Sequence, residues 1–240
     1  MCGLCGCSEE EASHQHDHEH DMHDHLHREI IHVEQDLLAK NNQFAAMNRH
    51  YFSDKKITAI NLMSSPGSGK TTLLSRTFLE KKHEIHMAVI VGDQQTDCDA
   101  EKLKAAGADA IQINTGKVCH LDAHMVGHSV EHLSLSKPAI LFIENVGNLV
   151  CPAIFDLGEA YKVVLLSVTE GDNKPLKYPD MFRKADLMIL TKMDLLPYVD
   201  FDTEKSIEYV QRINPSIKVI SLSTTSGSGL NAWYQWLAEK

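Results

Sequence analysis

The 240-residue sequence lacks the patterns that would direct it to a membrane, a secretory route or a nucleic acid. It has no run near the roughly 18 apolar residues that a membrane-spanning helix needs, so we expect no membrane segment. Its first residues lack the basic start and apolar stretch of a signal peptide, so we expect a cytoplasmic protein. Basic residues are not in excess: the net charge of -10 with His neutral argues against nucleic acid or an anionic membrane surface as a partner.

Cysteine is scarce, but three of the six cysteines, Cys2, Cys5 and Cys7, fall within the first seven residues. In a reducing cytosol, closely spaced thiols are more often metal ligands or redox groups than disulfides. The second Cys/His pair of a zinc knuckle does not follow at the required spacing, and the βαβ context of a redox Cys-x-x-Cys motif is missing. Three thiolates, with the α-amino group as a fourth ligand, favour square-planar Ni²⁺. We therefore expect a nickel site here.

Histidine is abundant: the chain has 15, and eight of them lie between His14 and His32. They alternate with acidic or polar residues, so residues 1–32 have almost nothing to bury and are predicted to be disordered without metal. We interpret this segment as a metal-binding tail. Its predicted imidazole ligands are His14, His16, His18, His20, His23, His25 and His27.

Residues 33–240 are the second predicted part, a folded domain. We expect it to begin with a helix from about Val33 to Phe52 that packs on the rest of the domain, because apolar residues recur there at helical spacing. The apolar positions of this helix are Val33, Leu37, Leu38, Phe44, Met47 and Tyr51.

From Ile57 onward, short apolar runs alternate with helical segments. Each run is nearly continuous and rich in β-branched residues or Leu, which is typical of strands buried on both faces of a parallel sheet. The predicted fold is therefore α/β, with a mostly parallel, doubly wound sheet. The seven runs read ITAINLMS, HMAVIV, AIQI, AILFIE, KVVLLSV, DLMILT and IKVISLS.

The segment SSPGSGKTT lies between the first apolar run and a helical run, as a phosphate-binding P-loop does. Gly69, Lys70 and Thr71 match the pattern G-x-x-x-x-G-K-[ST], whereas Ser64 stands where the pattern has Gly. Lys70 would reach the β- and γ-phosphates, and the Thr71 hydroxyl would bind Mg²⁺. Backbone N–H groups would wrap the phosphates. The predicted phosphate-binding residues are Pro66, Gly67, Ser68, Gly69, Lys70, Thr71 and Thr72.

Two apolar runs end in a carboxylate, Asp93 and Glu144. Taken alone, such a carboxylate is more often a helix cap or a salt-bridge partner. After a P-loop, the carboxyl end of a sheet strand is where Mg²⁺ needs a ligand, so we favour a metal-binding or water-orienting role for both.

The motif LTKMD ends a later run and favours GTP over ATP. Asp194 would accept hydrogen bonds from the N1–H and 2-amino groups of guanine, which adenine does not offer, and Lys192 would lie along the base and ribose. Thr191 stands where the usual Asn-Lys-x-Asp motif has Asn. The segment SLSTTSGSG, with Ser223 and Thr224, lies where a second base-contacting loop is expected. A structural alternative for Asp194 is to cap the next helix.

A second cluster of metal-binding residue types follows the third run, in GKVCHLDAHMVGHSVEHL. Cys119 and His120 are adjacent, and with Cys151 they would suit Ni²⁺ or Zn²⁺, either as an open site or as one completed by a second subunit. Taken alone, Cys151 would be a buried structural thiol. His120, His124, His128 and His132 recur every four residues, which on a helix makes one stripe. His124 and His128 are candidate ligands, and His132 is interpreted as solvated surface.

Together these motifs resemble the HypB family, GTPases that assist nickel insertion into nickel–iron hydrogenases. The departures are Ser64 in the P-loop and Thr191 in the base motif. The matching pieces cover nearly the whole chain and are Cys2-x-x-Cys5-Gly6-Cys7, the His-rich tail, LAKNN, SSPGSGKTTLL, VGDQQTDCDA, NTGKVCHLDAHMV, LFIENVGNLVCPAIFDLGE and LTKMDLLPY.

The resemblance implies a P-loop GTPase domain of the group that dimerises through nucleotide. Mg²⁺ would be held through Thr71, with Asp93 and Glu144 nearby. The implied nickel or zinc site at the dimer interface consists of Cys119, His120 and Cys151, and His124 and His128 join a second ion in some members. Cys2, Cys5 and Cys7 would form a separate nickel site. The implied partners are a HypA-type nickel chaperone, the hydrogenase large-subunit precursor and, for some members, a SlyD-type nickel protein.

We therefore expect a slow GTPase switch that moves nickel. Lys70 and Mg²⁺ would stabilise charge on the phosphates, while a carboxylate near Asp93 orients water. Hydrolysis would change the affinity of the Cys–His site for metal, and by linkage metal would change nucleotide affinity or dimerisation. The alternatives are a urease-accessory nickel GTPase, a nickel storage or buffering protein with a vestigial GTPase, and an ATP-dependent metal-cluster carrier.

Overall fold

The computed structural model describes residues 17–240 except 137, with side chains from residue 35 onward. The predicted ligands Cys2, Cys5, Cys7, His14 and His16 lie outside the described residues, as do the side chains of the other histidines of the tail. The compact domain comprises Asn41–Lys240 and begins eight residues after the predicted boundary. No helix among the described residues is long and apolar enough to span a membrane.

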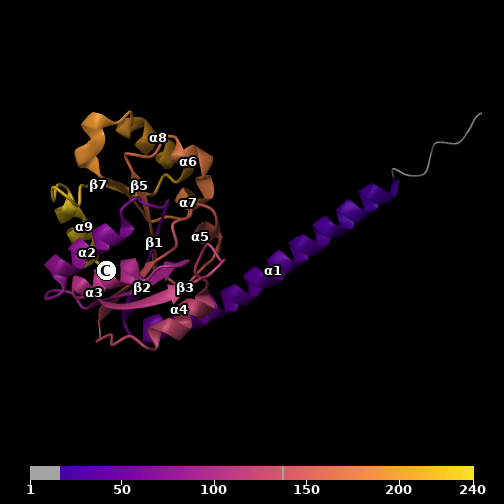
Figure 1. Ribbon diagram of the computed structural model, residues 1–240, viewed down its shortest axis with the longest axis horizontal. Helices are drawn as coiled ribbons and strands as arrows, with labels where there is room; N and C mark the ends of the chain where they lie inside the picture. Colours follow the sequence, from indigo (N-terminus) through magenta and orange to yellow (C-terminus); the bar gives the residue numbers. More distant parts are fainter. Residues whose placement is uncertain (1–16, 137) are drawn as a thin grey trace, which may run out of the picture. The chain divides into compact units, whose positions relative to one another are not determined.

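The core of the compact domain is a parallel sheet of seven strands in the order β3-β2-β4-β1-β5-β6-β7 (Figure 1). All six strand pairs are parallel, which confirms the predicted doubly wound α/β class. Each strand coincides with one of the seven apolar runs to within two residues at its start. The strands are β1 (Ile57–Ser64), β2 (Met87–Asp93), β3 (Asp109–Asn114), β4 (Ala139–Glu144), β5 (Tyr161–Ser167), β6 (Leu187–Thr191) and β7 (Lys218–Ser221).

Helices cover both faces of the sheet, which is why the strands are apolar on both sides. Alternate residues of β1 show this: Ile60 and Leu62 pack with α2, α3 and α9, whereas Ala59 packs with α4 and Met63 with α7 and α8. The helices are α1 (Asp17–Asp54), α2 (Lys70–Lys81), α3 (Cys98–Ala105), α4 (Ala123–Val130), α5 (Cys151–Ile154), α6 (Lys174–Lys177), α7 (Pro179–Arg183), the 3₁₀ helix η1 (Met193–Tyr198), α8 (Thr203–Ile213) and α9 (Leu230–Ala238).

Helix α1 is longer than its predicted range. It extends over Asp17–Asp54, so residues 17–32 have helical backbone where the composition predicts disorder. The segment contains no Gly or Pro, the residues that most strongly end helices, and therefore nothing in it opposes continuation of the helix.

The buried face of α1 in the compact domain is also not the predicted one. The apolar residues Met47 and Tyr51 are exposed, at 65% and 36% of their surface, and the neighbouring face with Asn41, Ala45 and Asn48 is buried. The asparagines tolerate burial because their amides bond to backbone groups of other segments. The helix does pack on the domain, through Ala45 and Phe52 as well as through the two asparagines.

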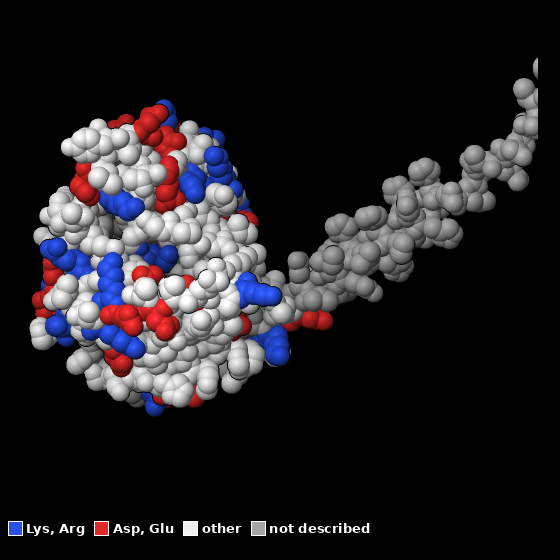
Figure 2. Space-filling view, viewed as in Figure 1, with Lys and Arg blue, Asp and Glu red and all other residues white. Residues whose placement is uncertain are grey.

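Charge is mixed on the face of the compact domain seen in Figure 2. Lys and Arg lie among Asp and Glu both over α8, at the top of the view, and over α2 and α3 below it. The described residues of this face carry no continuous basic patch of the kind that binds nucleic acid.

Candidate functional site

The P-loop connects β1 to α2 at the carboxyl edge of the sheet. Gly67 and Gly69 have φ values of 73° and 103°, a left-handed conformation that favours glycine. Gly69 is followed at once by the first turn of α2, so the unpaired N–H groups of that turn face the loop. The local sequence thus builds an anion-binding loop at a helix N-terminus.

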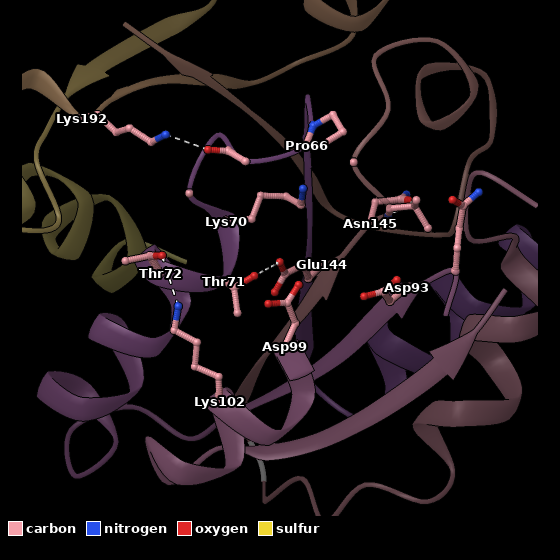
Figure 3. Close-up of a pocket in the computed structure, with 16 residues that line it drawn as sticks. Pro66, Lys70, Thr71, Thr72, Asp93, Asp99, Lys102, Glu144, Asn145 and Lys192 are labelled. Atoms are coloured by element: carbon pink, nitrogen blue, oxygen red, sulfur yellow. Dashed lines mark hydrogen bonds between the residues drawn. The ribbon is translucent and has the colours of Figure 1, made fainter. Parts of the chain in front are cut away.

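A pocket of 530 Å³ lies over this loop. The structure brings most of the predicted nucleotide-binding residues together there (Figure 3): Pro66, Gly67, Gly69, Lys70, Thr71, Thr72, Asp93, Glu144 and Lys192 line it. Five further residues with side chains also line it, namely Gln94, Asp99, Lys102, Asn145 and Val146. Ser68 contributes its backbone to the loop and is almost fully buried.

Lys70 lies at the floor of the pocket. Its ammonium group donates a hydrogen bond of 2.9 Å to the hydroxyl of Ser64, the residue that replaces the Gly of the P-loop pattern. Burial lowers the pKa of Lys70, while the carboxylate of Glu144 acts in the opposite direction. A buried cation with one neutral partner is well prepared to bind phosphate oxygens.

Glu144 is buried at the end of β4, beside the loop. Its Oε1 accepts a hydrogen bond of 2.6 Å from the Thr71 hydroxyl, whereas its Oε2 has no partner among the described residues. Burial raises the pKa of Glu144 to about 7. A buried carboxylate oxygen without a partner, next to a hydroxyl, fits a hard divalent cation such as Mg²⁺.

Asp93 and Asp99 bring two more carboxylates to the pocket. Asp93 accepts hydrogen bonds from the Thr96 hydroxyl (2.8 Å) and from the backbone N–H of Gln95 (3.2 Å). Partial burial acts to raise its pKa, but these hydrogen bonds bring it below the ordinary value. Asp93 thus also stabilises the turn after β2, a structural role that differs from the helix cap or salt bridge considered above.

The sequence reasoning missed Asp99. It lies in the first turn of α3, and Figure 3 shows its carboxylate directed toward Glu144, whose pKa its charge raises. Lys102, one turn later, donates to the Thr72 hydroxyl at 3.5 Å. Asp99 lies within the family-matching segment VGDQQTDCDA, which by itself assigns it no role, and Lys102 lies outside the motifs given above. The sequence signal available for Asp99 was an acidic residue in the first turn of the helix that follows β2.

The predicted base-binding residues follow β6 and β7. Thr191 donates its hydroxyl to the Ser68 carbonyl at 2.7 Å, and Lys192 donates to the Gly67 carbonyl at 2.8 Å. Thr191 therefore holds the P-loop to β6 rather than presenting its hydroxyl to a base.

The remaining predicted base contacts lie beside the phosphate pocket. Asp194 accepts a hydrogen bond of 2.5 Å from the Ser223 hydroxyl, which orients its carboxylate. Thr224 is half-buried in the same loop. Asp194, Ser223 and Thr224 do not line the pocket over the P-loop, whereas Lys192 does. Lys192 is therefore the predicted base-binding residue that connects this group to the pocket.

The structure also brings Cys119, His120 and Cys151 together. Their ligand atoms all lie within 4.8 Å of one another, and the two sulfur atoms are 3.1 Å apart. The His120 ring stacks on Phe155, and its Nδ1 is buried without a partner among the described residues. The hydrogen bond with Cys119, together with burial, raises the pKa of Cys151, and burial lowers that of His120. Two sulfurs and an imidazole at this spacing suit a borderline divalent metal.

The predicted stripe of four histidines is not formed on one helix. Asp122 caps α4 through a hydrogen bond from the Met125 N–H, so His120 lies before the helix and His132 after it. The His124 ring contacts the Phe44 ring of α1 in a tilted arrangement, and together with His128 it lines a separate pocket. Within this chain these two imidazoles are not part of the Cys–His cluster.

A Gly-rich loop at a helix N-terminus, a buried lysine and strand-end carboxylates on a parallel α/β sheet define a P-loop nucleotide-binding protein. This one carries a Cys–His cluster beside the pocket. The CobW/HypB/UreG nucleotide-binding domain matches residues 58–221. Hydrogenase maturation factor HypB of Azotobacter vinelandii is 58% identical over 208 residues, which are 87% of this chain and 69% of that protein.

Two solved structures are similar over most of their length. The crystal structure of HypB from Helicobacter pylori in complex with nickel has a TM-score of 0.80 and 40% identity, covering 84% of this chain and 94% of that one. Hydrogenase maturation factor HypB from Archaeoglobus fulgidus has a TM-score of 0.79 and 41% identity, covering 84% and 98%. The chain belongs to the HypB family.

Proposed function

We propose that this protein is a GTP-hydrolysing nickel metallochaperone that assists nickel insertion into a nickel–iron hydrogenase. One arrangement carries the proposal: the Cys–His cluster and the P-loop pocket share the segment Glu144–Cys151. It begins at the carboxylate bonded to Thr71 and ends at the thiol beside Cys119. The nickel complex of the Helicobacter pylori relative supports nickel as the cargo.

Hydrolysis would depend on positioning and electrostatics. The N–H groups of the P-loop and the Lys70 ammonium would bind the phosphates, and Asp194 the guanine base. Thr71 and Glu144 would hold Mg²⁺, which supplies positive charge at the β- and γ-phosphates. Asp93 or Asp99 would orient the attacking water, and Asp99 is added here because its carboxylate lies in the pocket.

The metal site would be completed by a second subunit. Cys119, His120 and Cys151 supply three ligands, one fewer than the four that Zn²⁺ or square-planar Ni²⁺ takes. Val118, Val150 and Ile154, next to these ligands, are exposed apolar residues that a partner subunit would cover. We infer a homodimer in the cytoplasm whose formation depends on nucleotide and metal. Its partners would be a HypA-type chaperone, the hydrogenase large-subunit precursor and, in some settings, a SlyD-type nickel protein.

The proposal is tested with the intact protein and two variants, Lys70→Ala and Cys119→Ala. We expect the intact protein to hydrolyse GTP slowly and to bind nickel with an affinity that differs between GDP and a non-hydrolysable GTP analogue. Lys70→Ala should lose GTP hydrolysis but keep nickel binding. Cys119→Ala should keep GTP hydrolysis but lose nickel binding at the Cys–His cluster. Identical nickel affinity and oligomeric state with both nucleotides would contradict a nucleotide-gated site, and a strong preference for ATP would contradict the GTPase assignment.

A further inference from the structure

The buried face of α1 in the compact domain includes two amides, Asn41 and Asn48, beside the apolar residues Ala45 and Phe52. Asn41 and Asn48 are 5% and 6% exposed, and every hydrogen bond that they make goes to the backbone of other segments. Burying amides on a helix face offers less stabilisation than burying apolar side chains, since their desolvation offsets most of the gain. The two amides are therefore better suited to fixing the geometry of the segments that they contact than to stabilising the fold.

Both asparagines contact the same two segments. The Asn41 amide donates to the Asp156 carbonyl at 2.8 Å and accepts from the Ala123 N–H at 2.9 Å. The Asn48 amide donates to the Ala123 carbonyl at 2.7 Å and to the Leu157 carbonyl at 3.0 Å. Each side chain therefore bridges the start of α4 and the loop after α5.

These two segments are the ones that supply the ligands of the Cys–His cluster. Ala123 follows His120 by three residues, and Asp156 follows Cys151 by five. Cys119 and Cys151 are 32 residues apart in the chain, so their separation depends on tertiary contacts.

Two glycines allow α1 to approach closely enough for these bonds. A Cβ atom on Gly127 of α4 would lie 2.4 Å from the Asn48 Oδ1. A Cβ atom on Gly158 would lie 2.6 Å from the Ala45 carbonyl oxygen and 2.7 Å from the Asn48 Cβ. The Arg49 guanidinium adds a bidentate ion pair with the Asp156 carboxylate. The contact therefore depends on particular residues of α1 and on particular residues of the segments that α1 contacts.

We propose that Asn41 and Asn48 are positioning residues for the metal site, and that α1 holds the two ligand segments at the separation that the metal requires. The inference rests on the proposed function, because it assumes that Cys119, His120 and Cys151 bind nickel. Partners that orient metal ligands from outside the ligand set typically change affinity by about 10- to 100-fold when they are removed.

The test uses the full chain with Cys2, Cys5 and Cys7 replaced by Ala, so that thiolate-to-nickel absorption reports on the remaining thiols. Into this parent we would introduce Asn48→Ala, the milder Asn41→Ala and, as a matched control, Asn42→Ala, which lies on the exposed side of the same helix. In the same parent, Cys119→Ala gives the thiolate-to-nickel absorption that remains when the Cys–His cluster is disrupted. Nickel titration, the absorption spectrum at saturating nickel, GDP affinity and the thermal midpoint are measured for each protein.

We expect Asn48→Ala to bind nickel about tenfold or more weakly than the control and to change the spectrum at saturation, with GDP affinity within about twofold of the parent. A merely structural role would lower the thermal midpoint and leave the saturated spectrum unchanged. That result, or equal nickel affinity for all three asparagine variants, would overturn the inference. If Asn48→Ala does not fold, Asn41→Ala decides by the same criteria. A parent that binds no nickel would instead overturn the proposed function.

Discussion

The side-chain oxygen of Asn145 accepts a hydrogen bond of 3.1 Å from the backbone N–H of Leu121. Asn145 lines the nucleotide pocket and follows Glu144, whereas Leu121 follows His120 of the Cys–His cluster. Gly147, two residues further along, packs so closely on Pro66 of the P-loop that a Cβ atom would lie 2.8 Å from its Cα. A shift of this segment on binding a γ-phosphate would therefore reach the metal-binding loop directly.

The first prediction is that Asn145→Ala weakens the coupling between nucleotide and nickel. Linked sites typically share a coupling free energy of about 1–3 kcal/mol, and the bond from Leu121 to Asn145 is one direct side-chain route for it. Nickel affinity would be measured with GDP and with a non-hydrolysable GTP analogue. We expect the ratio of the two affinities to move toward one in the variant. Asn231→Ala, an exposed substitution on α9, should keep the ratio of the intact protein. An unchanged ratio in Asn145→Ala would rule out this route.

The second prediction concerns the pH dependence of stability in the metal-free protein. The pKa of Glu144 is raised from 4.5 to about 7 by burial, so between these values the folded state binds the extra proton. The free energy of unfolding should therefore fall as pH rises through this window. Glu144→Gln lacks this contribution, and its stability should depend less on pH. Urea unfolding in a chelator at about pH 5 and about pH 8 measures the difference.

Mg²⁺ provides the complementary measurement. Binding of the cation requires the ionised carboxylate, so the affinity of the nucleotide-bound protein for Mg²⁺ should increase with pH across the same window. If Glu144→Gln shows the same slope of stability against pH as the intact protein, Glu144 is not the titrating group.

The third prediction tests base recognition. Asp194 is the predicted guanine-binding residue, and its carboxylate accepts a hydrogen bond from the Ser223 hydroxyl. Asp194→Asn replaces an acceptor with a donor, so it should lose the bidentate contact to guanine, worth about 1–3 kcal/mol for comparable base contacts, and gain affinity for xanthosine triphosphate. Competition binding of GTP, XTP and ATP measures the change. A variant that still prefers GTP to XTP would show that Asp194 does not read the base.

The fourth prediction concerns the core. Trp233 of α9 is fully buried, stacks on Trp236 and donates its indole N–H to the Thr77 hydroxyl at 3.0 Å. Trp233→Ala leaves a large cavity and removes the hydrogen bond to Thr77, so we expect a loss of about 3–5 kcal/mol in the free energy of unfolding. Tyr198→Ala is the control, because Tyr198 is 83% exposed and its loss should cost at most about 0.5 kcal/mol. Equal losses for the two variants would contradict this account of the core.

Much of the fold could be predicted from the sequence because its signals are local. Apolar continuity identified all seven strands, and the order of strand, Gly-rich turn and helix identified the P-loop. Parallel pairing then places Asp93 and Glu144 at one edge of the sheet, since the carboxyl ends of parallel strands lie together.

Other features had no local signal. The apolar period of α1 suggested that Met47 and Tyr51 would be buried, but the buried residues include two asparagines whose partners lie 75 to 115 residues away. Asp99 belongs to the segment VGDQQTDCDA, but nothing local indicates that its carboxylate lies in the pocket, which depends on how α3 packs beside α2. The four-residue spacing of the histidines predicted one stripe, but α4 begins after its cap at Asp122 and ends at Val130, so His120 and His132 lie outside it.

The sequence by itself determined the strand pattern, the phosphate loop and the family, because periodicity and contiguous motifs are properties of neighbouring residues. Only the tertiary structure decided which side of α1 is buried, that Cys119 and Cys151 lie 3.1 Å apart, and that His124 and His128 lie elsewhere. The physical reason is that a buried amide or thiol is positioned by partners far along the chain. The bonds from Asn41, Asn48 and Asn145 to distant backbone groups exist only once the sheet and its loops have formed.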